Sequence, residues 1–210
     1  MLLYVDVQYA SPYALSAFVA LQEKGLSFTI ETLDLAAGDQ QRPDFARLSI
    51  SGRVPTLVDG DFALSESSAI AEYVDEVHPG PALYPSAPRA RARARQVQAW
   101  LRSDFLPLRQ DRSTEVIFYG PTAQPLSAAA GHSAARLFAG AGELLAHGGD
   151  HLCGDAWCIA DVDLALMLNR LLLNGDAVPD ALARYAIRQW QRPSVQSWAR
   201  RQRPPRVATT

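Results

Sequence analysis

Residues 79 to 88 read PGPALYPSAP, and this stretch divides the chain into two parts with different secondary-structure signals. Four prolines in ten positions rule out both a helix and a central strand, because proline has no N–H and its ring clashes inside a helix. Before this stretch, apolar and polar residues alternate in short runs, which is typical of strands. After it, helical spacing dominates. We therefore predict two domains, at 1–78 and 89–210, joined by a Pro-rich linker at 79–88.

The first domain is predicted to begin with a strand, a helix and a second strand. Alternating residues at 3–7 indicate the first strand, Ser11-Pro12 provides an N-cap with proline at the first helical position, and Gly25 ends the helix. Residues 27–33 alternate again, and Asp59-Gly60 favours a tight hairpin between two further strands. With a short helix near 44–50 and an apolar helical stripe at 69–77, the predicted order is β-α-β-(α)-β-β-α.

The second domain carries almost no strand signal. Its apolar spacing predicts helices at 89–112, 125–147, 161–175, 179–191 and 193–202, separated by Gly, Pro or Asp. The sequence thus predicts an α/β domain followed by an all-α helical bundle.

Composition excludes some partners. A net charge of -2 and a pI near 6.1 give no general attraction to nucleic acid. The arginines at 89, 91, 93 and 95 alternate with alanine, which scatters them around a helix rather than forming one basic face. The most apolar run, 162–173, is interrupted by polar residues and too short to cross a bilayer. We expect neither a nucleic-acid nor a membrane partner.

The N-terminus and the two cysteines both bear on the cellular compartment. The N-terminus shows no basic segment and no small-residue cleavage site, so we predict a cytoplasmic protein without a signal peptide. Cys153 and Cys158 are five positions apart and lack a matching His pair, which fits neither a zinc site nor a disulfide framework. The expectation is two free thiols and no metal.

Two short motifs could face a ligand or be purely structural. Ser11 could be only a helix cap, contributing about 1 kcal/mol, or its hydroxyl could also face a ligand. The bond between Val54 and Pro55, in the run Arg53-Val54-Pro55 at a strand start, could be cis and turn the backbone outward. The alternative is an ordinary trans proline at a strand edge.

A third motif, Glu66-Ser67, stands at a strand-to-helix turn. Free amides and the positive end of the helix dipole can hold a carboxylate there, while the Glu66 side chain can pair with an ammonium group. Such a site would bind an amino-acid zwitterion. The alternative is a helix that is merely capped by Ser65 or Ser67.

The order and spacing of these motifs over nearly the whole chain resemble a glutathione S-transferase. The shared pieces are S-P-Y, R-V-P-T-L and S-E-S-S-A-I in the first domain, the Pro-rich linker, and GDAWCIADVDLA in the helical domain. The resemblance implies a thioredoxin-like first domain. S-P followed by an aromatic residue looks most like the serine-type plant tau class and certain bacterial relatives.

The resemblance also implies roles for the motif residues. Ser11 would be the catalytic hydroxyl that faces the glutathione thiol. Val54 would pair its main chain with the cysteinyl part of glutathione beside cis-Pro55, while Glu66 with Ser67 would hold the γ-glutamyl end. Arg53 would be the residue to reach the glycyl carboxylate. Tyr9 or Tyr4 is the alternative donor to the sulfur, as tyrosine is in other classes of the family.

One position departs from the family pattern. Members usually place Ser or Thr where Cys158 stands, capping the helix that Asp161 helps to anchor. A thiol is a poorer acceptor than a hydroxyl, so the cap is expected to be weaker, with more bearing on folding than on activity.

The implied activity is a transferase that forms the glutathione thiolate for attack on a hydrophobic electrophile, or on a peroxide oxygen, between the domains. Glutathione is the co-substrate, no metal is required, and a homodimer is expected. The residues considered for the electrophile pocket are Tyr13, Phe105, Arg109 and Phe118, for which a core position is the alternative. Two rival functions remain: an inactive binding or scaffold protein with this fold, and a glutathione-dependent isomerase.

Overall fold

The computed structural model describes residues 1–206, which form two compact units. One unit comprises Met1–Leu83 and residues 194–206, and the other comprises Tyr84–Pro193. The final helix therefore packs with the first unit, whereas the sequence analysis places it in the helical domain. The physical reason is Trp198, which is fully buried and packs against Phe18 of the first unit, with ring centroids 5.2 Å apart.

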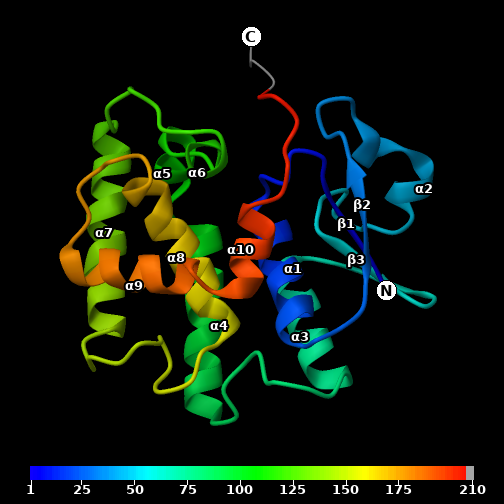
Figure 1. Ribbon diagram of the computed structural model, residues 1–210, viewed down its shortest axis with the longest axis horizontal. Helices are drawn as coiled ribbons and strands as arrows, with labels where there is room; N and C mark the ends of the chain where they lie inside the picture. Colours follow the sequence, from blue (N-terminus) through cyan, green and yellow to red (C-terminus); the bar gives the residue numbers. More distant parts are fainter. Residues whose placement is uncertain (207–210) are drawn as a thin grey trace. The chain divides into compact units, whose positions relative to one another are not determined.

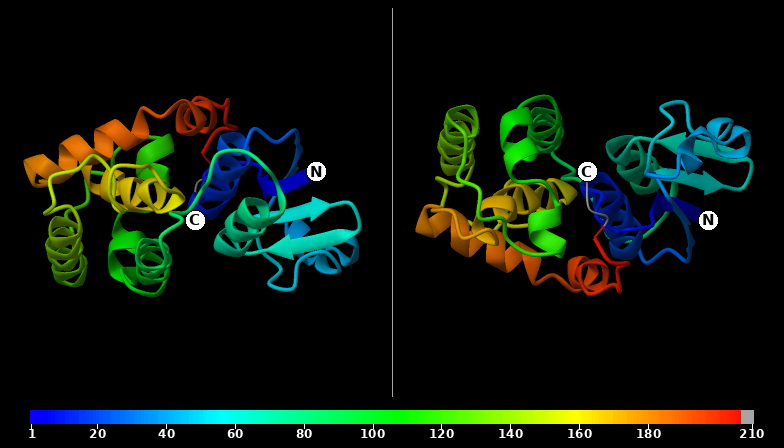
Figure 2. Two further views of the ribbon diagram at one scale, coloured as in Figure 1. Left: turned by 90° about the horizontal axis from the view of Figure 1, so that it is seen from below. Right: turned by 90° about the horizontal axis from the view of Figure 1, so that it is seen from above.

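The first unit is built on a four-stranded sheet in the order β2-β1-β3-β4 (Figures 1 and 2). Its elements are β1 (Leu2–Asp6), α1 (Pro12–Glu23), β2 (Thr29–Leu33), a 3₁₀ turn (Asp39–Gln41), α2 (Pro43–Ala46), β3 (Thr56–Asp59), β4 (Phe62–Ser65) and α3 (Ser67–Val77). β1 pairs with β2 in parallel and with β3 antiparallel, and β3 pairs with β4 antiparallel. The predicted element order, including the hairpin at Asp59-Gly60, is confirmed.

The two faces of this sheet follow from side-chain alternation along β1. Leu3 and Val5 are fully buried on the face that packs against α1 and α3, whereas alternation places Tyr4 on the opposite face. There its ring packs edge-on against Phe45 of α2, at a centroid distance of 5.3 Å. A core therefore lies on each side of the sheet.

The second unit is entirely helical in the described residues, apart from an isolated β-bridge between His151 and Gly154. Its helices are α4 (Pro88–Ser103), α5 (Leu106–Asp111), α6 (Glu115–Phe118), α7 (Ala128–Leu144), α8 (Ile159–Leu172) and α9 (Asp180–Trp190), and α10 (Pro193–Ala199) follows. α8 is buried along almost its whole length and packs against α4 and α9. Within residues 1–206, no helix is long and apolar enough to cross a membrane.

The prediction of one helix at 89–112 was wrong. The structure has two helices there, α4 and α5, with Asp104 and Phe105 between them. Phe105 has a φ of +63°, which breaks the helical path, and Pro107 stands in the first turn of α5, where a missing N–H is tolerated. Helical periodicity alone did not reveal the break because the apolar spacing continues through it.

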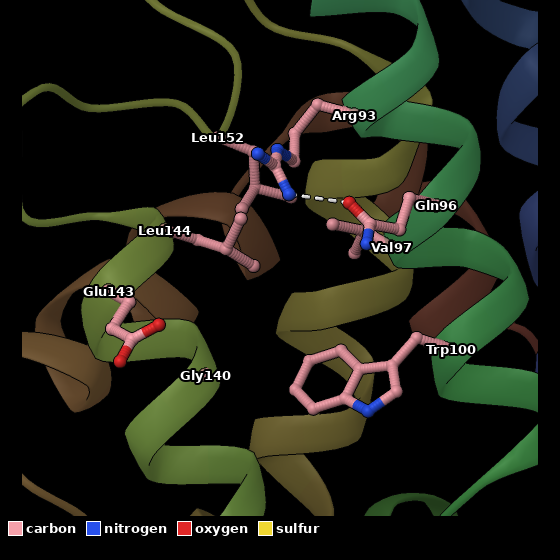
Figure 3. Close-up of a pocket in the computed structure, with 8 residues that line it drawn as sticks. All are labelled: Arg93, Gln96, Val97, Trp100, Gly140, Glu143, Leu144 and Leu152. Carbon is pink, nitrogen blue, oxygen red and sulfur yellow. Dashed lines mark hydrogen bonds between the residues drawn. The ribbon is translucent and has the colours of Figure 1, made fainter.

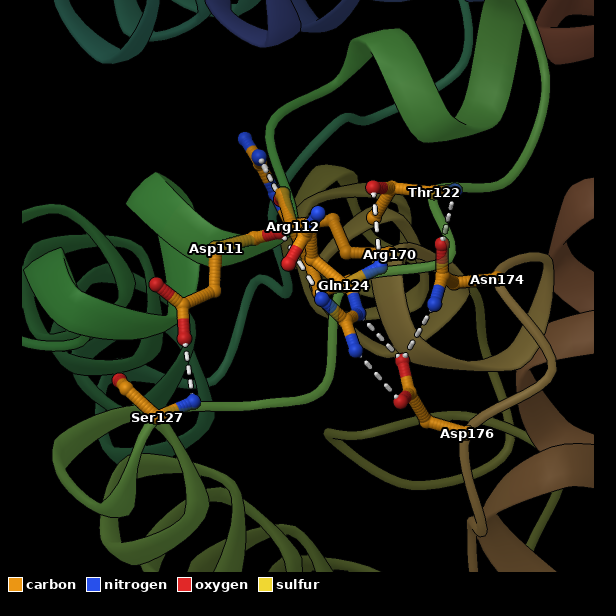
Figure 4. A network of polar contacts seen from close by, with 8 residues as sticks. All are labelled: Asp111, Arg112, Thr122, Gln124, Ser127, Arg170, Asn174 and Asp176. Atoms are coloured by element: carbon orange, nitrogen blue, oxygen red, sulfur yellow. Dashed lines mark hydrogen bonds and ion pairs between the residues drawn. The ribbon is translucent and has the colours of Figure 1, made fainter.

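A polar network joins the end of α5 to the loops around α7 and α8 (Figure 4). Arg112 is almost fully buried and pairs with Asp176 through two hydrogen bonds, of 2.6 and 2.8 Å. Its carbonyl oxygen accepts a hydrogen bond from Arg170, and Asp111 accepts one from the main-chain N–H of Ser127. These bonds satisfy charged groups that would be costly to bury alone.

Candidate active site

The sheet register brings the three sequence motifs to one edge of the first unit. Tyr4 of β1 and Ser65 of β4 both pair with Thr56, the first residue of β3. Because both pairings are antiparallel, the chain leaving β1, the chain entering β3 and the chain leaving β4 meet at the same end of the sheet. Those three segments contain Ser11, Val54-Pro55 and Glu66-Ser67. The structure therefore brings the predicted glutathione-site motifs together.

Ser11 is the N-cap of α1, and Pro12 occupies the first helical position, as predicted. Its Oγ accepts a hydrogen bond from the main-chain N–H of Ala14 at 3.2 Å. A hydroxyl has one proton to donate and two lone pairs to accept with, and capping uses one lone pair. The half-buried Ser11 hydroxyl keeps its proton for another acceptor. Capping and ligand contact, which the sequence posed as alternatives, are thus compatible.

Asp6 positions the segment that leads into Ser11, and the sequence reading missed it. Its carboxylate accepts the N–H groups of Ala10 at 2.7 Å and of Ser11 at 3.1 Å. The residue is only 3% exposed, and this burial raises the pKa of the carboxyl group, while the two N–H bonds lower it in part. An acidic residue inside a short apolar strand was the signal that could have identified it.

The Arg53-Val54-Pro55 segment precedes β3, and the peptide bond between Val54 and Pro55 is cis, as the resemblance implied. β3 begins at Thr56, so the main chain of Val54 lies outside the strand ladder. The main chain of Arg53 is held by Ser49, whose Oγ accepts from its N–H and donates to its C=O. Ser49 thus fixes the main chain of the residue directly before Val54.

Glu66 and Ser67 begin α3. Glu66 has a φ of +77°, a conformation uncommon for a residue with a side chain, and its side chain is exposed and does not cap the helix. Ser67 is buried at the first helical position. The first turn of α3 contains no acidic residue that would offset the positive end of the helix dipole.

The rings of both tyrosines considered as alternative donors pack against other residues of the first unit. Tyr4 faces α2, on the sheet face opposite α1, and burial followed by the nearby Glu31 raises the pKa of its hydroxyl. The ring of Tyr9 makes an edge contact with Trp198 at 5.4 Å and lies under the guanidinium of Arg201 at 5.0 Å.

Asp161 anchors the start of α8. It is fully buried and accepts hydrogen bonds from the main-chain N–H groups of Leu152 and Cys158, both at 2.8 Å, and from the Tyr185 hydroxyl at 2.7 Å. Cys158 and Asp161 form a capping box. The Cys158 thiol lowers the pKa of the half-buried Cys153 thiol, and both cysteines are free.

The four residues considered for the electrophile pocket occupy different environments. Phe105 is 3% exposed and packs against Trp100, with centroids 4.7 Å apart. Arg109 donates to the carbonyl oxygens of Leu101 and Asp104, whereas Tyr13 and Phe118 are half-buried. The core alternative therefore fits Phe105. Arg109 stabilises the C-terminal end of α4 through its two hydrogen bonds.

A hollow of about 530 Å³ lies within the second unit between α4 and α7 (Figure 3). Its lining residues are Arg93, Gln96, Val97, Trp100, Gly140, Glu143, Leu144 and Leu152. A Cβ on Gly140 would lie 2.6 Å from the Trp100 ring, so glycine permits the close approach of α7 to this side chain. None of the predicted site residues lines this hollow. Residues 1–206 contain no group of three or more His, Cys, Asp or Glu able to hold a metal ion.

Comparison with known proteins decides the family. A model of the glutathione S-transferase N-terminal domain matches residues 10–77, and a model of the C-terminal domain matches residues 88–201. The chain belongs to the glutathione S-transferase family. Glutathione S-transferase Z1 of Arabidopsis thaliana is 31% identical over 166 residues, which cover 77% of this chain and 75% of that protein.

Two solved structures are similar to this glutathione S-transferase over almost its full length. A glutathione transferase homolog from Burkholderia, with bound glutathione, is 48% identical, covers 94% of each chain and has a TM-score of 0.75. Maleylacetoacetate isomerase from Methylobacterium extorquens AM1, with bound malonate and glutathione, is 28% identical. The match covers 95% of this chain and 96% of the isomerase chain, also with a TM-score of 0.75. The predicted thioredoxin-like domain followed by a helical domain is confirmed.

Proposed function

We propose that this glutathione S-transferase binds glutathione and stabilises its thiolate through the Ser11 hydroxyl for attack on a hydrophobic electrophile. The observation that carries the proposal is the Ser11 geometry: Oγ accepts from Ala14, and the hydroxyl proton is left to donate. Membership of the family and the glutathione bound in the Burkholderia homolog support it.

The proposed stabilisation is large enough to matter. A free thiol with a pKa of about 8.5 is only a few per cent thiolate at pH 7, and the thiolate is the nucleophile. Lowering that pKa by about two units requires about 2.7 kcal/mol. A hydrogen bond to a charged acceptor supplies roughly 1.5 to 3 kcal/mol, and the N-terminus of α1 adds about 0.3 to 1 kcal/mol.

The rest of glutathione would be held along the same edge of the sheet. Val54 would pair its main chain with the cysteinyl part, and Arg53 would reach the glycyl carboxylate. The N-terminus of α3 and Ser67 would receive the γ-glutamyl carboxylate, while the exposed Glu66 carboxylate would pair with the ammonium group.

A substrate panel tests the proposal. Aryl halides, organic hydroperoxides, disulfides and unsaturated keto acids would be assayed with glutathione, alongside a calorimetric titration of glutathione alone. We expect binding together with conjugation of the aryl halide, and reduction of the hydroperoxide would add a peroxidase activity. Glutathione binding without turnover on any substrate would favour the scaffold alternative, and absence of binding would overturn the proposal.

A glutathione-dependent isomerase is the second candidate. The similarity to the Methylobacterium maleylacetoacetate isomerase over nearly the whole of both chains favours it. An isomerase would use the same thiolate, but glutathione would be regenerated rather than consumed. Isomerisation of the unsaturated keto acid, with no net loss of glutathione and no activity on aryl halides, would replace conjugation as the function.

We also propose that the protein is a cytoplasmic homodimer, as the family resemblance implies. The two free cysteines suit a reducing compartment. Sedimentation at micromolar concentration should give about twice the chain mass of 22.9 kDa, and a monomer mass would reject the dimer.

A further inference from the structure

The segment after α10 reaches back to the loop that carries Ser11. α10 lies along α1 (Figure 1), with the Ser194 hydroxyl hydrogen-bonded to Glu23 near the end of α1. At the other end of α10, the Trp198 ring packs against Phe18, at 5.2 Å, and Tyr9, at 5.4 Å. The final helix is therefore attached near both ends of α1, and its last turn lies at the active-site loop.

The carbonyl oxygen of Tyr9 is the atom that this segment holds. It accepts a hydrogen bond from the Trp198 indole N–H at 3.1 Å and another from the Arg203 guanidinium at 3.2 Å. Trp198 is fully buried, so its N–H needs this partner to avoid an unsatisfied donor. Tyr9 itself has a φ of +48°, an uncommon backbone conformation that surrounding contacts must maintain.

Arg203 is suited to hold this carbonyl in a fixed place. Its guanidinium also donates to the carbonyl oxygens of Trp198 and Ala199, in the last turn of α10, and of Arg201 just after it. A planar group with several donors in a fixed geometry loses little further freedom when it bonds one more carbonyl. The neighbouring Arg201 guanidinium lies over the rings of Tyr9 and Phe18, 5.0 Å from each ring centroid.

Two sets of contacts therefore fix the short loop on either side of Tyr9. The Asp6 carboxylate holds the amides of Ala10 and Ser11, and the Trp198 and Arg203 donors hold the Tyr9 carbonyl. We propose that Trp198 and Arg203 are positioning residues that fix the Tyr9 carbonyl and thereby aim the Ser11 hydroxyl at the glutathione sulfur. This inference rests on the proposed role of Ser11, and it adds a contribution from a segment about 190 positions downstream.

Two conservative substitutions test the positioning role. Trp198→Phe removes the indole donor and keeps an aromatic ring, and Arg203→Lys keeps the charge and removes the planar fork. Each should raise the pKa of enzyme-bound glutathione by about half a unit to one unit, and slow conjugation near neutral pH by roughly three- to tenfold. The dissociation constant of glutathione should change little, and the rate loss should shrink at alkaline pH. Arg200→Ala, an exposed cation on the same segment, is the control and should leave the pKa unchanged.

The same measurement in a Ser11→Ala background separates this inference from the proposed function. If the segment acts through Ser11, Trp198→Phe and Arg203→Lys should shift the pKa no further once that hydroxyl is gone. A pKa shift by Ser11→Ala but by neither positioning variant would overturn this inference and leave the proposed function standing. No shift by Ser11→Ala would overturn the proposed function itself. Equal shifts with and without Ser11 would show that the two residues act on glutathione by another route.

Discussion

Ser11 and Ser127 cap their helices in the same way. Each hydroxyl oxygen accepts a hydrogen bond from the main-chain N–H three residues on, at 3.2 Å in both cases. Ser11 precedes α1 at the sheet edge where the glutathione motifs meet, whereas Ser127 precedes α7 in the helical unit. The pair therefore separates the effect of losing a cap from the effect of losing the proposed catalytic hydroxyl.

The first prediction compares Ser11→Ala with Ser127→Ala. Both should lower the free energy of unfolding by about 1 kcal/mol, because each removes one N-cap bond. Only Ser11→Ala should raise the pKa of bound glutathione, by about one to two units, and slow conjugation near neutral pH roughly tenfold or more. The ultraviolet absorbance of the bound thiolate against pH checks this. Coincident titration curves for all three proteins would mean that Ser11 only caps its helix.

The second prediction concerns Glu66, whose exposed side chain takes no part in capping α3. Glu66→Ala should raise the glutathione dissociation constant about tenfold or more, equivalent to the roughly 1.5 to 3 kcal/mol of a charged hydrogen bond. Turnover at saturating glutathione should change little. Glu76→Ala, another exposed glutamate on the same helix, serves as the control in a calorimetric titration. Unchanged affinity in both variants would remove Glu66 from the site.

Local chemistry made much of this fold predictable from the sequence. Neighbouring residues determine the Ser11-Pro12 cap, the Asp59-Gly60 hairpin and the strand alternation. Short stretches of sequence are therefore sufficient to predict these features. The motif order also placed Ser11, Val54 and Glu66 in one family site, and the strand register brings their segments to one edge.

The missed features depend on distant parts of the chain. The Tyr9 carbonyl receives donors from Trp198 and Arg203, which no local pattern connects to it. Asp6 is buried because the Ser11 loop folds over it, so its role was visible only once that loop was in place. The break at Phe105 depends on a left-handed backbone angle, to which hydrophobic periodicity is insensitive.

The third prediction tests Asp161, which is fully buried and accepts three hydrogen bonds. Asp161→Asn keeps one acceptor oxygen and leaves at least one buried donor without its partner, so we expect a loss of roughly 2 to 4 kcal/mol in unfolding free energy. Asp155→Asn, in the exposed loop before α8, is the control and should cost less than about 0.5 kcal/mol. Urea denaturation measures both, and equal midpoints would contradict an anchoring role.

The fourth prediction concerns the pH dependence of stability at Asp6. Burial raises the pKa of this carboxyl group in the folded protein, and the N–H bonds from Ala10 and Ser11 offset only part of the effect. The unfolded chain titrates at about pH 3.9, so the folded state binds the Asp6 proton more tightly than the unfolded state does. The stabilising contribution of Asp6 is therefore greatest below about pH 3.9, and it is lost as the pH rises through the folded pKa.

Asp6→Asn isolates this contribution because asparagine does not titrate. The amide also loses one acceptor for the two N–H groups, but that cost is the same at every pH. The unfolding free energy of the wild type minus that of Asp6→Asn should therefore decrease between about pH 4 and pH 7, by about 1.4 kcal/mol per unit of raised pKa. Urea titrations at four pH values measure the slope, with the exposed Asp61→Asn as the control. A difference that increases with pH would show that the N–H bonds outweigh burial at Asp6, and a flat difference would show that they cancel.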